Sequence, residues 1–300
     1  MADPSRRATY LAYRTGAAAA QMMPPAFGVP AARGIGRALV FAMPGRRRMV
    51  ARHLRRASEG TLSGSALDRA VAGAFDSYAR YWLEMFRLPR ERPRSIERNF
   101  EIVGYEHVEA ALAAGRGAIA VTPHLGGWEW AGAWMASAKQ QRLLVVVEPV
   151  EPPELFEWFV KVRSAMGMEV VPLGDDTATR TLKALRDNRV VCLVSDRDLT
   201  GGGIEVEFFG ERTTLPAGPA TLALRTGAPI LPVAVYFERG RRHRAVVRPP
   251  LDTRRGAGRL RDDVVRITQA LAHELETLIR AAPQQWHLMQ PNWPSDLEAI

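Results

Sequence analysis

One stretch of this 300-residue chain places a histidine and a glutamate where they can act together. Residues 118–130 read Ala-Ile-Ala-Val-Thr-Pro-His-Leu-Gly-Gly-Trp-Glu-Trp, with His124 directly after Pro123 and Glu129 five residues later. An imidazole that a carboxylate holds protonated on one nitrogen can take a proton from an alcohol with the other. The alcohol oxygen can then attack an acyl carbonyl. The pair therefore indicates general-base catalysis of acyl transfer.

The spacing of this pair constrains the backbone between its two residues. Five residues within one regular helix point two side chains to different sides of the axis. His124 must therefore precede a helix that holds Glu129 in its first turn, and the Gly126-Gly127 pair permits that bend. Backbone N–H groups of Gly126, Gly127 and Trp128 would then face the oxyanion that forms on the carbonyl.

Two other roles stay open for His124: a cap on the following helix, or a metal ligand. One histidine and one carboxylate make too few ligands for a usual zinc site. The single cysteine, Cys192, excludes a disulfide framework and lies in an apolar segment, where it reads as a core residue. We therefore expect neither a metal nor a cofactor.

From residue 100 onward, short apolar runs alternate with helical patterns. The apolar runs predict strands at Phe100–Val103, Ala118–Thr122, Leu143–Val147, Glu169–Pro172, Val190–Ser195, Ile204–Phe208, Ile230–Phe237 and Arg244–Val247. The helical patterns predict helices at His107–Ala114, Trp128–Ser137, Glu154–Met166, Thr177–Asp187, Ala217–Arg225 and Arg261–Ala281. This order predicts an α/β fold with a mostly parallel central sheet sandwiched by helices. His124 then follows the carboxyl end of a strand, where open α/β sheets bind ligands.

The first fifth of the chain carries all of the excess positive charge. Residues 1–56 hold 11 Arg and one acid, whereas the other 244 residues hold 30 basic and 31 acidic side chains. Helical patterns at 8–23, 30–43 and 46–56 combine an apolar face with an arginine-rich face, which is typical of helices that contact an anionic membrane. The alternative is that these helices pack on the body with solvated arginines.

We expect residues 1–60 to be a basic amphipathic extension of the domain formed by residues 61–300. A long amphipathic helix is predicted at 64–88. No run of 18 apolar residues occurs, so no membrane-spanning helix is expected. The start of the chain also lacks the apolar core of a secretory signal.

Several segments together resemble a known enzyme family. The run His-Leu-Gly-Gly-Trp-Glu at 124–129 resembles the histidine–four residues–acid motif of the glycerophospholipid and lysophospholipid acyltransferases, in the form of the lipid A lauroyl-acyltransferase branch. Matching segments follow in the same order at Val194–Asp198, Phe208–Gly210, Leu215–Pro219, Ala228–Val233 and Pro283–Trp286. The arginine-rich composition, the run at 196–203 and Gln290–Trp293 are most similar to the actinobacterial members.

This resemblance implies a peripheral acyltransferase at the cytoplasmic face of the inner membrane. The actinobacterial members move palmitoyl from acyl-CoA to a mannose hydroxyl of phosphatidylinositol mannoside. The resemblance makes His124 the base, Glu129 its orienting acid, and Glu148 a contact of the polyol head group. No covalent acyl-enzyme is needed, and we expect a monomer.

Three further side chains are candidates for contacts with the head group or the CoA phosphates: Arg163, Arg197 and Asp198. An arginine can grip phosphate with two parallel hydrogen bonds. For Glu148 and Arg163 the alternative is a structural ion pair. Tryptophans of the predicted helix at 128–137 either wall an acyl groove or pack in the core: Trp128, Trp130 and Trp134.

Two rival functions stay open at this level. One is a non-enzymatic module that binds an anionic membrane or nucleic acid through its basic N-terminal segment. The motifs are spread over the charge-balanced body, which favours an enzyme, and we expect no nucleic-acid partner. The other rival is lauroyl-type transfer to a lipid A precursor or a lysophospholipid.

Overall fold

The computed structural model describes residues 4–297, so Met1–Asp3 of the predicted basic segment lie outside the described residues. The described chain begins with four long helices: α1 (Pro4–Met22), α2 (Pro25–Ala42), α3 (Pro44–Ala57) and α4 (Gly64–Arg87). Pro25 and Pro44 stand at the starts of α2 and α3, where proline has a helical φ and its missing N–H costs nothing. The prediction that the second helix starts at Pro30 is therefore wrong, because Pro25 already starts it.

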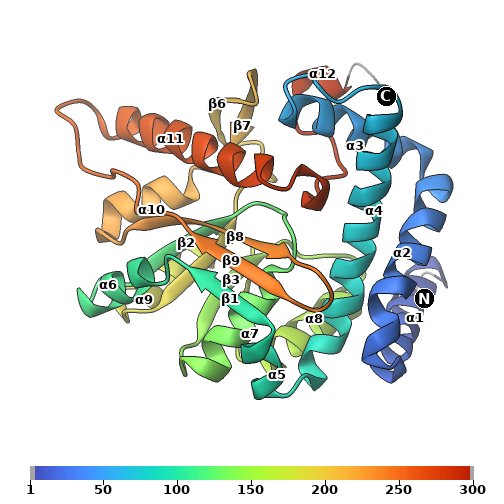
Figure 1. Cartoon of the computed structure of the whole chain (residues 1–300). Coiled ribbons are helices and arrows are strands. Elements are labelled where there is room, and N and C mark those ends of the chain that lie inside the picture. The colour runs from blue at the N-terminus through green and yellow to red at the C-terminus, as the bar shows by residue number, and fades with distance from the viewer. Residues whose placement is uncertain (1–3, 298–300) are drawn as a thin grey trace.

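The centre of the molecule is one seven-stranded sheet in the order β1-β9-β8-β2-β5-β3-β4 (Figure 1). Its strands are β1 (Phe100–Val103), β2 (Ala118–Thr122), β3 (Leu143–Val147), β4 (Glu169–Pro172), β5 (Val190–Val194), β8 (Ile230–Phe237) and β9 (His243–Val247). The strands from β8 to β4 are parallel, and β9 runs antiparallel to β8. The predicted fold class, a mostly parallel sheet between helices, is confirmed.

One predicted strand lies outside this sheet. β6 (Ile204–Phe208) pairs with β7 (Glu211–Leu215), which the sequence patterns missed, in a separate antiparallel hairpin. Phe209 and Gly210 join the two strands with positive φ values of 52° and 74°. Two such residues form the tight turn whose twist matches that of a hairpin.

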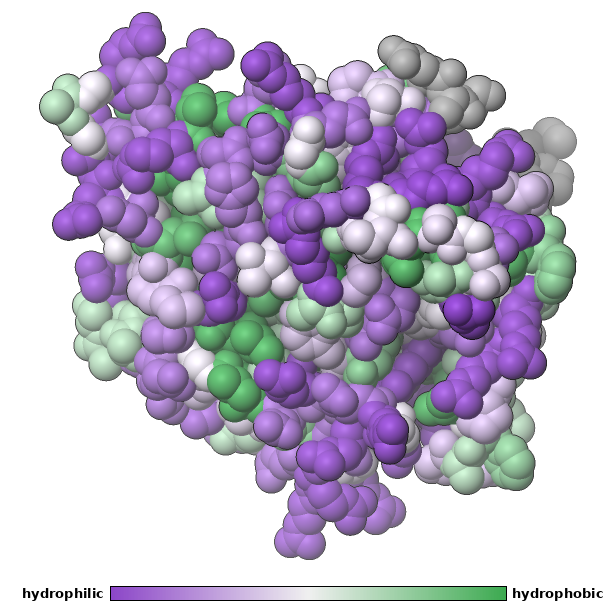
Figure 2. Space-filling model, turned by 45° about the horizontal axis from the view of Figure 1, so that its top comes forward, coloured by the Kyte–Doolittle hydropathy of each residue, from purple (hydrophilic) through white to green (hydrophobic). Residues whose placement is uncertain are grey.

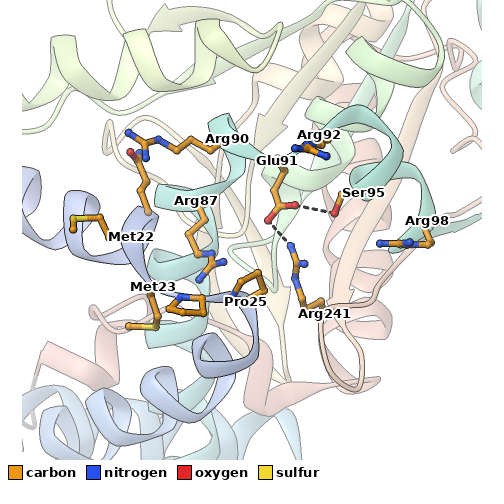
Figure 3. A pocket seen from close by; sticks show the side chains of 12 residues that line it. Met22, Met23, Pro25, Arg87, Arg90, Glu91, Arg92, Ser95, Arg98 and Arg241 are labelled. Atoms are coloured by element: carbon orange, nitrogen blue, oxygen red, sulfur yellow. Dashed lines mark hydrogen bonds and ion pairs between the residues drawn. The ribbon is translucent and has the colours of Figure 1, made fainter.

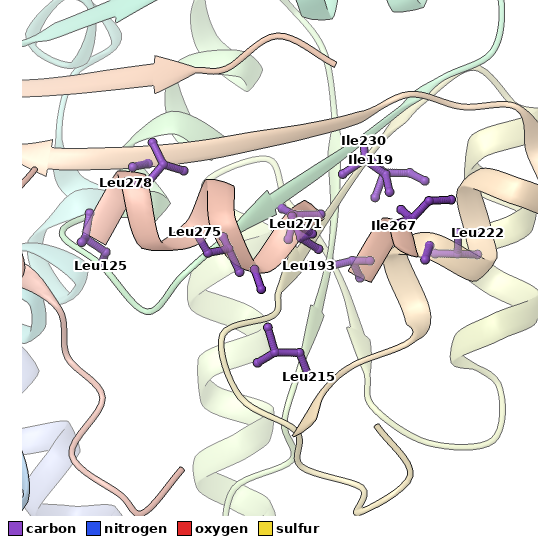
Figure 4. Packing of buried hydrophobic residues seen from close by; sticks show 14 of the residues in the cluster. Ile119, Leu125, Leu193, Leu215, Leu222, Ile230, Ile267, Leu271, Leu275 and Leu278 are labelled. Atoms are coloured by element: carbon purple, nitrogen blue, oxygen red, sulfur yellow. The ribbon is translucent and has the colours of Figure 1, made fainter. Parts of the chain in front are cut away.

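Helices cover both faces of the sheet. The remaining elements are η1 (Leu88–Arg90), α5 (Pro93–Arg98), α6 (Glu106–Ala113), α7 (Trp128–Ala138), α8 (Pro153–Ala165), α9 (Thr177–Arg186), α10 (Gly218–Thr226), α11 (Leu260–Arg280), η2 (Pro283–Gln285) and α12 (Pro294–Leu297). One apolar cluster joins the sheet to α9, α10 and α11, and a second joins its other face to α5, α6 and α7. Figure 4 shows Leu271, Leu275 and Leu278 of α11 lying near the strands in the first cluster.

The N-terminal helices pack along α4 on one side of the molecule (Figure 1). A Cβ atom on Gly36 of α2 would lie 2.6 Å from the Cα atom of Asp76 in α4, so only glycine permits this approach. Large apolar side chains of α1 and α2 stay exposed, with Met22 and Phe41 each 81% exposed. Within residues 4–297, no helix has the length and apolarity that a bilayer crossing requires. On the face in Figure 2, hydrophilic side chains dominate and hydrophobic ones form small patches.

Candidate active site

The strand register brings His124 beside an acid that is far away in the sequence. β2 and β5 are neighbours, with Thr122 opposite Val194, so the residues two positions further on meet at the carboxyl edge. There the Nδ1 atom of His124 lies 2.6 Å from an oxygen of Asp196, and the backbone N–H of His124 donates to the other oxygen at 3.1 Å. Because an ionised carboxylate only accepts hydrogen bonds, Nδ1 carries the proton and Nε2 is left as the base.

The C-terminal segment holds this pair in place. The indole N–H of Trp286 donates to Asp196 at 2.7 Å, and the side-chain amide of Asn292 donates to the Asp196 carbonyl oxygen at 3.0 Å. The backbone N–H of His287 donates to the carbonyl oxygen of His124 at 2.7 Å. Asp196 and Trp286 are both buried, so the acid has a fixed orientation.

The environment makes His124 a stronger base than a free histidine. Partial burial lowers the pKa of His124, but the charge and hydrogen bond of Asp196 outweigh it and hold the pKa above its ordinary value of 6.5. Burial raises the pKa of Asp196, and here the His124 pair and the Trp286 hydrogen bond outweigh it, so that this pKa is lowered. Asp196 thus stays ionised where it can stabilise a protonated His124.

Glu129 does not orient His124, which corrects the expected dyad. The Glu129 carboxylate accepts a hydrogen bond from the Tyr81 hydroxyl at 2.8 Å and from the Arg163 guanidinium at 3.1 Å. No hydrogen bond or ion pair joins Glu129 to His124 within residues 4–297. Glu129 begins α7 but points toward α4 and α8, because those helices supply its partners. Burial raises its pKa, and Arg163 offsets part of that effect.

For Arg163, the structure favours the ion-pair alternative over a free head-group contact. Its side chain is 11% exposed and bonds Glu129, not Glu148. The guanidinium also lies over the Trp128 ring, 5.3 Å from the ring centre. Arg163 of α8 therefore forms an ion pair with α7, and it also contributes to the cavity wall.

The glycine turn supports the loop and does not supply oxyanion contacts. The N–H of Gly126 donates to the Gln285 carbonyl oxygen, and the N–H of Gly127 to that of Val235, each at 3.0 Å. The expectation that these two N–H groups face the reacting carbonyl is wrong, because both are already bonded. Gly126 has a φ of +59°, so the glycine is needed for the bend.

The remaining three candidates follow the ends of β3 and β5, and they differ in their contacts. Glu148 and Arg197 line the same cavity as His124, and both act on it electrostatically: Glu148 raises its pKa and Arg197 lowers it. Asp198 also lines the cavity, but its oxygens accept hydrogen bonds from Thr200 and Gly203 within its own loop. Asp198 is therefore a loop-ordering residue, and Glu148 and Arg197 are the better head-group candidates.

A cavity of about 490 Å³ opens beside His124, whose side chain is 43% exposed. Its walls are mainly apolar and come from several strand ends and helices: Trp82, Val146, Phe159, Leu173, Leu193 and Leu222. This size and lining suit an apolar ligand with a few polar contacts at one end. Trp128 joins the wall, whereas Trp130 stacks on His243 and Trp134 packs on Phe100, so only the first of the three tryptophans fits the groove hypothesis.

Residues 3–295 match the profile of bacterial lipid A biosynthesis acyltransferases. The chain belongs to this family. It is 41% identical over 298 residues to the phosphatidylinositol mannoside acyltransferase of Mycobacterium tuberculosis (strain CDC 1551 / Oshkosh), covering 98% of this chain and 91% of that protein. It is also 41% identical over 233 residues to the protein of the same name from Mycolicibacterium smegmatis, covering 77% and 74%. This member of the lipid A biosynthesis acyltransferase family is therefore an enzyme that transfers acyl groups.

Sequence reasoning missed the acid of the pair. Asp196 lies in the segment Val194–Asp198, which the sequence marks only as a motif, because nothing local shows that β5 is the neighbour of β2. The Trp286 hydrogen bond was likewise hidden, since its partner is 90 residues away. His124 and Asp196 each lie two residues after the paired strand-end residues Thr122 and Val194. This matching position would reveal the pair once the strand order is known.

Proposed function

We propose that this acyltransferase moves a palmitoyl group from acyl-CoA to a mannose hydroxyl of a phosphatidylinositol mannoside at the cytoplasmic face of the membrane. The names of the mycobacterial relatives support this acceptor. The apolar cavity beside His124 supports a long acyl chain. The observation that carries the proposal is the His124–Asp196 pair, whose histidine lines that cavity.

The proposed reaction uses His124 twice. Its Nε2 atom takes the proton of the mannose hydroxyl while the oxygen attacks the thioester carbonyl carbon. When the tetrahedral intermediate collapses, the C–S bond breaks and His124 returns the proton to the CoA sulfur. Asp196 stabilises the imidazolium between the two steps. Cys192 is no alternative nucleophile, because it is buried in β5 and burial raises its pKa to about 12.

We assign the acceptor head group to Glu148 and Arg197, two polar residues that line the cavity together with His124. Glu148 is exposed at the end of β3 and can accept hydrogen bonds from sugar hydroxyls. Arg197 offers a guanidinium to the phosphate of the lipid. Both act on His124 electrostatically, so the head group would lie where the base needs it.

The test is a transfer assay with purified protein, palmitoyl-CoA and phosphatidylinositol mannoside, with products identified by mass spectrometry. A parallel reaction offers a lauroyl acyl carrier protein and a lipid A precursor. We expect a palmitoylated mannoside and no acylated lipid A precursor. His124→Ala should remove the product, while His273→Ala, at an exposed histidine of α11, should not. Faster acylation of the lipid A precursor would refute the proposed acceptor.

A further inference from the structure

A second cavity, of about 520 Å³, lies apart from the one that contains His124. Figure 3 shows its walls, which come from the α1–α2 turn, the end of α4, the η1–α5 segment and the β8–β9 loop. Arginines dominate its lining: Arg87, Arg90, Arg92, Arg98 and Arg241. Four of them lie in the stretch 87–98, at the end of α4 and in η1–α5, and Arg241 comes from the β8–β9 loop; the sequence motifs include none of them.

The charges in this cavity are not balanced by the protein. The acid in its lining is Glu91, which accepts hydrogen bonds from Arg241 and from Ser95. Within residues 4–297, no ion pair or hydrogen bond engages the side chains of the other four arginines. One terminal nitrogen of Arg87 is buried without any hydrogen-bond partner. Such a buried donor is costly unless a ligand or a water molecule satisfies it.

Phosphate is the anion that fits this arrangement. A guanidinium presents paired N–H donors that match two phosphate oxygens, and several arginines can surround one phosphate group. Glu91 cannot neutralise the other four arginines, because it already pairs with Arg241. The volume exceeds that of a single ion and leaves room for a polar head group.

Apolar side chains at the rim indicate where the phosphate comes from. Met22, in the cavity wall, is 81% exposed, and Phe27, two residues after the lining residue Pro25 in α2, is 61% exposed. Exposed apolar side chains next to a basic cavity are what a protein needs at the boundary between lipid head groups and acyl chains. A lipid is therefore favoured over a soluble phosphate compound.

We propose that this cavity binds the phosphate head group of an anionic membrane lipid and anchors the enzyme beside its substrate. Trp82 of α4 lines the first cavity and Arg87 lines the second, five residues and about 7.5 Å further along the same helix. A lipid held at the second cavity thus keeps the first close to the membrane. This anchor goes beyond the proposed function, since it involves no side chain of the His124 cavity.

The test is vesicle flotation with phosphatidylcholine vesicles that contain phosphatidic acid. The variant Arg90→Gln/Arg92→Gln/Arg98→Gln removes three charges from the cavity. The control Arg116→Gln/Arg142→Gln/Arg186→Gln also removes three exposed charges. These arginines precede β2, β3 and β5, at the edge of the sheet opposite to the one where His124 lies. We expect the cavity variant to bind at least about tenfold more weakly, and the control to lose less than about twofold. Equal losses in both variants would show that net charge alone matters and would overturn the proposal.

A charge-preserving variant sharpens the result. Arg90→Lys/Arg92→Lys/Arg98→Lys keeps the charge but loses the paired donors, so we expect binding between that of the wild type and the glutamine variant. Binding equal to that of the wild type would overturn the proposal that paired arginine donors hold the phosphate. Transfer activity on detergent-dispersed substrates should stay within about twofold in all of these variants, so a failed anchor is distinguishable from a failed catalytic proposal. Retained vesicle binding together with lost binding of an acidic acyl carrier protein would assign the cavity to a protein partner instead.

Discussion

Asp196 decides which nitrogen of His124 acts as the base, because it fixes the proton on Nδ1. We predict that His124→Ala lowers turnover by a factor of about 10²–10⁴, the usual range for general-base catalysis. Asp196→Asn should be severe as well, since the base then loses its preferred tautomer. The two residues act as a unit, so the double variant should be little worse than His124→Ala. If His124→Ala keeps more than about a tenth of the activity, His124 is not the base.

The same pair predicts how activity depends on pH. Only unprotonated His124 accepts a proton, and Asp196 holds its pKa above 6.5, so kcat/KM should rise with pH and reach its midpoint above that value. In Asp196→Asn the raising effect is lost while burial still lowers the pKa. The midpoint should therefore move to lower pH, which a pH–rate profile of both proteins measures. A midpoint that does not move would exclude Asp196 as the partner of the base.

We predict that Glu129 stabilises the fold by pairing with Arg163 and takes no part in the proton transfer at His124. Glu129→Gln leaves the nearly buried Arg163 cation without its counter-charge, which costs about 3–5 kcal/mol for a buried pair. Thermal unfolding should show a lower Tm than in His124→Ala, while the midpoint of the pH–rate profile stays in place. Adding Arg163→Met should recover part of the stability. A shifted midpoint without a loss of Tm would instead return Glu129 to the role of orienting acid.

The β2–α7 loop needs glycine at position 126. A Cβ atom on Gly126 would lie 1.8 Å from the Val235 carbonyl oxygen, and the residue has a positive φ. Gly126→Ala should therefore displace the loop and abolish activity. Gly115→Ala is the matched control, because Gly115 also has a positive φ but no atom lies near its Cβ position. The control should cost only about 1–2 kcal/mol of backbone strain in denaturant unfolding. Equal costs would show that the contact with Val235 is relieved elsewhere.

The individual strands were easier to predict than the order in which they lie in the sheet. The apolar runs of β2 and β5 revealed both strands because buried parallel strands are continuously apolar. The order of the strands depends on packing between distant segments, so the meeting of His124 and Asp196 was not accessible. The hairpin partner β7 was missed for a different reason: its alternation of Thr213 and Leu215 with exposed residues is short and weakly apolar. The site motif was therefore predictable, whereas its hydrogen-bond partners were not.

Over the whole molecule, charge and apolar exposure gather on the N-terminal helices. Residues 1–56 contribute ten of the excess positive charges, and the remaining chain is nearly neutral. α1 and α2 also expose Leu11, Met22, Phe27, Ile35 and Phe41. Because these helices pack on α4, which lines the His124 cavity through Tyr81 and Trp82, their contact with a membrane would place that cavity near lipid substrates.

The diffuse attraction can be tested apart from the arginine cavity, because the basic run at 46–48 does not line that cavity. Arg46, Arg47 and Arg48 are exposed at the start of α3, and each contributes roughly 1 kcal/mol near an anionic surface. Changing all three to Ala should sharply weaken vesicle binding at low salt, where charges act over about 10 Å or more. Added salt should weaken binding of the wild type and reduce the difference between the two proteins, as flotation across a salt series measures. Binding that neither the substitutions nor salt change would show that the basic run does not contact the membrane, and would leave the apolar side chains as its only contacts.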